Sequence, residues 1–156
     1  MAFPSTPRAA VSALTSGDRL FLYATRGAWH NPPRDRGRII GTATAQSAVR
    51  LLDDPVEIAG RKLVSGCRLL VDGLVPYPGG LELRPLVEQL NAFPKPEVWP
   101  VYLRRTLLHL PATDASLLSK ELRPLVATRE IALATYPEEV HRRGGPPRRR
   151  QAPSAL

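Results

Sequence analysis

The chain has 156 residues, of which 43% are hydrophobic, and its formal net charge is +8. This length and hydrophobic share are typical of one globular domain with its own core, and the 17 prolines argue against a helical bundle. No run approaches the roughly 18 apolar residues of a membrane span, and the first residues lack the apolar segment of a signal peptide. The single cysteine, Cys67, excludes an internal disulfide and predicts a reducing, cytoplasmic location. Its apolar neighbours indicate a buried, unreactive thiol.

The first third of the chain predicts a helix followed by two strands. We expect a short helix over residues 7–14, ended by a turn at Ser16 and Gly17. From Arg19 onward, apolar residues alternate on both sides, which predicts a strand that is buried on both faces. A second strand is predicted over residues 38–46. The connection over residues 26–37 contains a Pro-Pro pair and is therefore expected to be a loop.

The remainder predicts short strands and a few short helices. We expect turns at 51–55 and 59–62, a strand at 67–75, a loop at 76–80 and a short helix at 83–90. Prolines predict an extended segment at 93–100, which leads into a strand at 101–110. Thr113 or Asp114 is expected to cap a helix over 115–122, and one more helix is predicted at 125–136.

These elements predict a β-rich α+β domain, with a small mixed barrel as its architecture. The expected organisation is a leader with a helix at residues 1–16, the domain at 17–135 and a tail at 136–156. The tail is rich in Arg, Gly and Pro and low in apolar residues, which predicts disorder.

Positive charge is concentrated in two places. The loop between the first two predicted strands, together with its edges, contains four arginines against one acid, Asp35, and the tail from residue 140 adds five arginines and no acid. The rest of the chain is close to neutral. Because the loop joins two strands, this charge pattern indicates an anion-binding mouth on a structured domain.

Three motifs resemble the EVE-domain family of the PUA-like superfamily, whose relatives include the YTH, ASCH and SRA domains. They are GDRLFLY at 17–23, GRIIGTATA at 37–45 and LRRTLLHLPATDASLL at 103–118. The resemblance covers residues 17–122 and implies a small PUA-like mixed β-barrel with short flanking helices. The chain departs from the family at its start, because residues 1–5 are too few for the strand that usually precedes the first helix.

The resemblance implies a module that binds nucleic acid and holds a base, often a modified one, in an aromatic-lined pocket. Stacking on an aromatic ring contributes roughly 1–3 kcal/mol per base. Trp29 is expected to stack on the base, and His30 and Asn31 to read its edge. Residues expected to line the pocket beside them are Tyr23, Thr25 and Trp99. Residues expected to hold phosphates are Arg26, Arg34, Arg36, Arg38 and Arg104.

The residues leave structural alternatives open. Trp29 equally fits a loop anchor, and Asn31 before a proline fits a turn residue. Tyr23 and Trp99 each fit a packed core ring, and Arg36 beside Asp35 fits a local ion pair.

Alternative functions are a hydrolase or binder of modified nucleosides or small molecules, as in the ASCH relatives, and an adaptor that binds through its basic tail. The sequence offers little for an enzyme. Its histidines, His30, His109 and His141, are far apart and lack ligands at metal spacing, and no nucleotide-binding or nucleophile motif is present. We therefore expect no catalytic residues, no metal and no cofactor.

Overall fold

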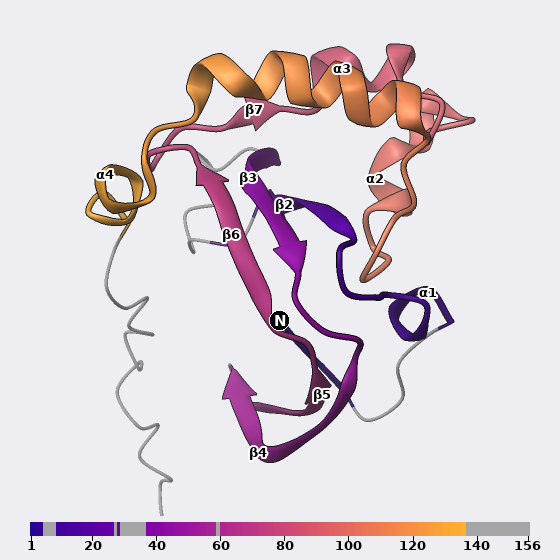
Figure 1. Cartoon of the computed structure of the whole chain (residues 1–156). Coiled ribbons are helices and arrows are strands. Elements are labelled where there is room, and N and C mark those ends of the chain that lie inside the picture. The colour runs from indigo at the N-terminus through magenta and orange to yellow at the C-terminus, as the bar shows by residue number, and fades with distance from the viewer. Residues whose placement is uncertain (5–8, 27, 29–36, 59, 137–156) are drawn as a thin grey trace, which may run out of the picture.

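An antiparallel sheet in the strand order β2-β3-β6 forms the centre of the computed structural model, and α3 runs across one end of it (Figure 1). The structure describes residues 1–4, 9–26, 28, 37–58 and 60–136. The short strand β7 pairs with the start of β3 and adds a fourth strand. The bounds of these strands are β2 Arg19–Ala24, β3 Arg38–Ala45, β6 Leu69–Leu74 and β7 Leu81–Glu82.

A second antiparallel sheet has the strand order β1-β5-β4. Its strands are β1 Ala2–Phe3, β4 Arg50–Ile58 and β5 Arg61–Gly66. Among the strands that the structure describes, no pairing joins the two sheets or closes either one into a barrel. The expected α+β class is therefore confirmed, in the form of two open sheets with short helices.

The close approach of β3 and β6 depends on a glycine. Strand β3 alternates between buried and half-buried residues, with Ala43 and Ala45 fully buried. A Cβ atom on Gly41 would collide with the carbonyl oxygen of Gly73 on β6. Small residues at these positions let the two backbones pack tightly, as the sequence of β3 indicates.

The helices in the described part of the chain are short, and α3 alone among them is longer than two turns. The 3-10 helix η1 and helix α3 supply the apolar residues that face the central sheet. The bounds are α1 Ala9–Ser12, η1 Arg84–Gln89, η2 Pro96–Val98, α2 Trp99–Tyr102, α3 Ala112–Leu122, η3 Arg123–Leu125 and α4 Arg129–Leu133. No helix in these described ranges is long and apolar enough to cross a membrane.

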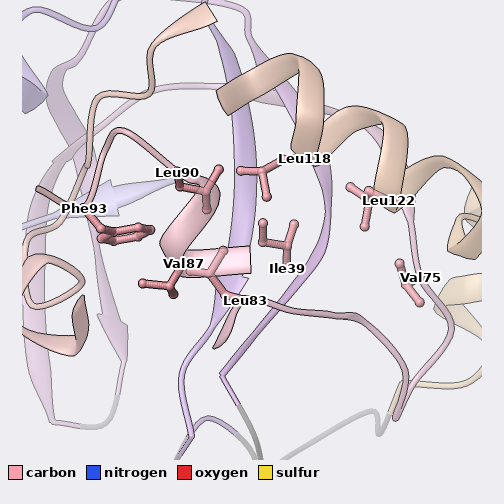
Figure 2. Close-up of a cluster of buried hydrophobic side chains, with 8 residues drawn as sticks. All are labelled: Ile39, Val75, Leu83, Val87, Leu90, Phe93, Leu118 and Leu122. Carbon is pink, nitrogen blue, oxygen red and sulfur yellow. The ribbon is translucent and has the colours of Figure 1, made fainter. Parts of the chain in front are cut away.

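The main core lies between α3, η1 and the central sheet (Figure 2). Its buried members are Ile39, Val75, Leu83, Val87, Leu90, Phe93, Leu118 and Leu122. A smaller cluster on β3 and its neighbours contains Leu14, Ala45 and Cys67. Cys67 is buried and forms no disulfide, which confirms the buried thiol expected from its neighbours.

Two expectations for the second sheet are wrong. A strand does precede the first helix, because Ala2 and Phe3 pair with β5 and the ring of Phe3 is 2% exposed. Residues 51–55 belong to the continuous strand β4 and form no turn. The β4–β5 register shifts between Leu51 and Val56, around Pro55, and such an irregularity accommodates a proline within a strand.

The expectations for residues 93–110 are also wrong. Residues 96–102 form the helices η2 and α2, and residues 103–110 form no strand. Pro96 is the first residue of η2 and Pro100 the second residue of α2. Backbone N–H groups in the first turn of a helix have no partner within the helix, so a proline there costs no hydrogen bond, and its fixed φ favours helix. The prolines therefore start helices here.

Around α3, two further expectations need correction. The helix begins at Ala112 with Pro111 at its N-cap, and neither Thr113 nor Asp114 caps it with a side chain. The helix expected over 125–136 is η3 followed by α4, with an extended residue, Ala127, that bridges to Leu74 of β6.

Candidate functional site

The predicted loop site sits at one end of the central sheet. The last register pair between β2 and β3 is Ala24 with Arg38, so the connection leaves and re-enters the sheet at these two residues. Thr25 and Arg26 follow β2 directly and are exposed. Five residues of the predicted site lie outside the described residues, namely Trp29, His30, Asn31, Arg34 and Arg36.

Arg38 is held firmly at this end of the sheet. Its side chain is half-buried, and its guanidinium donates a hydrogen bond to the carbonyl oxygen of Pro78. Its aliphatic stem lies on Gly80, where a Cβ atom would be 2.6 Å from the Arg38 Cδ. Gly80 also has a φ of +148°, which favours glycine. The backbone of residues 78–80 therefore contacts both the guanidinium and the aliphatic part of the Arg38 side chain.

Two tyrosines accompany Arg38. The ring centroids of Tyr77 and Tyr136 are 5.9 Å apart, with planes tilted by 52°. The Tyr136 hydroxyl donates to the carbonyl oxygen of Val75 at 2.8 Å, and the Tyr77 backbone N–H donates to Thr135 Oγ1 at 2.7 Å. These bonds fix α4 and the loop after β6 to each other. We call Arg38, Tyr77, Pro78 and Tyr136 the Arg38 cluster.

Burial and the charge of Arg38 act on the Tyr136 phenol in opposite directions. Burial raises the pKa of the Tyr136 phenol, and the positive charge of Arg38 lowers it by a smaller amount, so the net pKa is raised. The Tyr136 hydroxyl therefore stays protonated at neutral pH and is kept as a hydrogen-bond donor.

Tyr23 lies near the same end of β2. Its half-buried ring packs against the main core, and its hydroxyl lies so close to Gly37 that a Cβ atom there would collide with it. Burial raises the pKa of Tyr23. The ring thus combines core packing with a polar tip at the base of the connection.

The other two predicted site residues lie on or just after α2. Trp99 packs against the main core and meets Phe93 edge-on, with ring centroids 6.3 Å apart. This is the core position that its alternative interpretation expected. Arg104 is exposed in a turn after α2, so it does not lie on the strand that the sequence predicted over residues 101–110.

A second polar site lies under the C-terminal part of α3. It is a cleft of about 300 Å³ between α3, the segment after it and the sheet. It is lined by Arg19, Thr42, Asp72, Gly73, Ser119, Leu122, Arg123 and Val126. We call it the α3 cleft. The side chain of Val126 packs directly on Gly73 and closes one side of the cleft. The contact is so close that a Cβ atom on Gly73 would lie only 2.7 Å from Val126 Cγ1.

Sequence reasoning missed both the tyrosine pair and the α3 cleft. Tyr77 and Tyr136 come together only through the packing of α4 on the end of β6. Arg19, Asp72 and Arg123 come from three separate elements. No local spacing in the sequence signals either group.

Among the described residues, no group of three or more His, Cys, Asp or Glu side chains is placed to hold a metal ion. No model of a known protein family matches the chain, and no curated protein matches it.

Proposed function

We propose that this protein binds nucleic acid through the end of the central sheet where β2 leads into β3. The observation that carries the proposal is the position of Arg38, which is fixed beside Tyr77 and Tyr136 where an arginine-rich connection rejoins the sheet. The contact surface would comprise the Arg38 cluster and residues 25–37.

The chemistry of this surface suits a nucleic acid. Guanidinium groups bind phosphate oxygens with paired hydrogen bonds, and a held arginine loses less freedom on binding. Tyrosine rings offer a stacking surface for bases without sequence preference. A net charge of +8 favours association with a polyanion.

The three motifs that resemble the EVE-domain family support a more specific proposal. It is a PUA-like barrel of the EVE type in which Trp29 stacks on a modified base while His30 and Asn31 read its edge. Arg26, Arg34 and Arg36 would then hold the flanking phosphates together with Arg38. Tyr23 and Thr25 would form the wall next to the sheet. Because Trp99 packs on Phe93 in the core, the proposal does not depend on it.

Fluorescence anisotropy with labelled oligonucleotides tests the proposal. The full chain is titrated into single-stranded RNA, single-stranded DNA and duplex DNA, at two salt concentrations. Arg38→Ala should weaken binding by about tenfold or more, as loss of a charge-assisted contact implies. The matched control is Arg50→Ala, an exposed arginine on β4 of the other sheet. Equal affinities for the two variants would overturn the proposal.

The basic tail needs its own control. A full-length variant with Gln at Arg142, Arg143, Arg148, Arg149 and Arg150 removes the tail charge. If binding depends on the domain, this variant still binds, with a shallower dependence on salt because fewer phosphates are neutralised. If binding disappears with the tail charge and survives Arg38→Ala, the protein is an adaptor that binds through its tail. That result would also overturn the proposal.

A further inference from the structure

The α3 cleft is lined by two arginines, Arg19 and Arg123. Arg19 starts β2 and Arg123 follows α3, and both are exposed. Within the ranges described by the structure, neither guanidinium forms an ion pair or a side-chain hydrogen bond. Two available guanidiniums on facing elements offer fork-shaped donors to a phosphate group.

The same cleft contains one carboxylate, held in place by β3. Asp72 Oδ2 accepts a hydrogen bond of 2.7 Å from Thr44 Oγ1. In the described part of the chain, Oδ1 accepts no hydrogen bond and is left for a donor in the cleft. A bare oxyanion would be repelled by this carboxylate, so the cleft suits a ligand that carries both an anionic group and a hydrogen-bond donor.

We infer that the α3 cleft binds a nucleotide. The phosphate would lie against Arg19 and Arg123, and a sugar hydroxyl or a base amino group would donate to Asp72 Oδ1. Hydroxyl groups of Thr42 and Ser119 line the same space. The volume of about 300 Å³ is at the lower end of the range for small-ligand pockets, which fits one nucleotide unit.

This inference is independent of the proposed contact surface. Arg19 pairs with Thr44 at one end of the β2–β3 ladder, and Arg38 pairs with Ala24 at the other. Five residue steps along a strand separate these ends by roughly 17 Å. Nucleotide binding in the cleft can therefore hold while oligonucleotide binding at the Arg38 cluster fails, and the reverse.

Isothermal titration calorimetry of the full chain tests the inference. The probes are the four ribonucleoside monophosphates, the matching nucleosides and inorganic phosphate. We expect at least one monophosphate to bind about tenfold more tightly than phosphate or its nucleoside. The reason is that the monophosphate alone has both a phosphate for the two arginines and a hydrogen-bond donor for Asp72. Arg19→Gln and Arg123→Gln should each weaken that binding by about tenfold. The matched control Arg61→Gln, at the exposed first residue of β5, should leave it unchanged.

The Asp72→Asn variant distinguishes a role in ligand binding from damage to the fold. It removes the repulsion of a bare anion, so phosphate should bind more tightly while the preference for the nucleotide shrinks. Asp53→Asn on exposed β4 is its control. Absence of monophosphate binding at millimolar concentration, equal affinity for phosphate alone, or insensitivity to both arginine variants would overturn the inference.

The source of the nucleotide is settled by one more probe. A trinucleotide with a 5′ phosphate that binds as tightly as the monophosphate assigns the cleft to the end of a nucleic acid. Binding of the monophosphate alone assigns it to a free nucleotide. Either outcome supports the cleft as a nucleotide site.

Discussion

The Asp114 carboxylate accepts a hydrogen bond of 2.7 Å from the backbone N–H of Ala92, 22 residues earlier in the chain. It also accepts one of 3.0 Å from the side chain of Asn91. Asp114 lies in the first turn of α3 and is 1% exposed. Its hydrogen bonds therefore join α3 to the turn after η1, and the two elements that cover the main core are fixed to each other.

Asp114→Ala should destabilise the protein by about 1–3 kcal/mol, because it leaves the backbone N–H of the half-buried Ala92 without its acceptor. Urea unfolding followed by circular dichroism measures the change. The control Asp53→Ala removes an exposed carboxylate on β4 and should change stability by no more than about 0.5 kcal/mol. Similar effects of the two variants would show that the Asp114 bonds contribute nothing specific.

The same carboxylate predicts a pH dependence. Burial raises the pKa of Asp114, but hydrogen bonds from Ala92, Asn91 and Thr113 together outweigh burial and lower it below the ordinary value of 3.8. Because the folded pKa is the lower one, the stability contributed by ionised Asp114 is full above the ordinary value and is lost as pH falls through the folded pKa. The difference in unfolding free energy between the wild type and Asp114→Asn should therefore shrink as pH falls below 3.8. A difference that stays constant over an acid pH series would contradict the lowered pKa.

Leu118→Ala should cost about 2–5 kcal/mol, because it leaves a cavity in the main core. Leu118 is 1% exposed and packs among the residues of Figure 2. The same substitution at Leu51, which is 75% exposed on β4, is the matched control and should be nearly neutral. The midpoints of chemical unfolding compare the two. If Leu51→Ala proved the more damaging, the assignment of the core to the α3 side would be wrong.

Gly41→Ala should destabilise the protein by about 1–3 kcal/mol, because the added methyl group has no room in a tightly packed interior. The methyl would meet the Gly73 carbonyl oxygen, which is backbone and cannot rotate away. Gln46→Ala, at an exposed position directly after β3, is the control. Thermal unfolding distinguishes them, and a neutral Gly41→Ala would mean that β3 and β6 lie farther apart.

Arg38→Ala should raise the pKa of Tyr136 further, because the arginine charge stabilises the phenolate while burial opposes it. NMR titration of ring-labelled tyrosine resolves the four tyrosines of the chain. Arg50→Ala should leave the Tyr136 titration in place. An unchanged Tyr136 in Arg38→Ala would separate the two groups and remove the central member of the proposed surface.

Strands β2 and β3 could be predicted from the sequence because their signal is local. Alternating apolar residues from Arg19 and the small residues around Gly41 are written into consecutive positions, and the structure has strands there. The burial of Cys67 was equally predictable from its neighbours. The prolines did not allow the local structure to be predicted, because Pro96 and Pro100 fit the first turn of a helix as well as an extended chain.

The order of residues along the chain was enough to predict the α+β class, the strands β2 and β3 and the arginine-rich connection between them. Packing between distant elements pairs the ring of Tyr77 with that of Tyr136. It also brings Asp114 of α3 to the backbone N–H of Ala92, and it gathers Arg19, Asp72 and Arg123 in one cleft. Periodicity reports which face of an element is apolar, whereas these groupings depend on how distant elements pack. That packing is the sum of many weak contacts across the core, and no short stretch of sequence contains it.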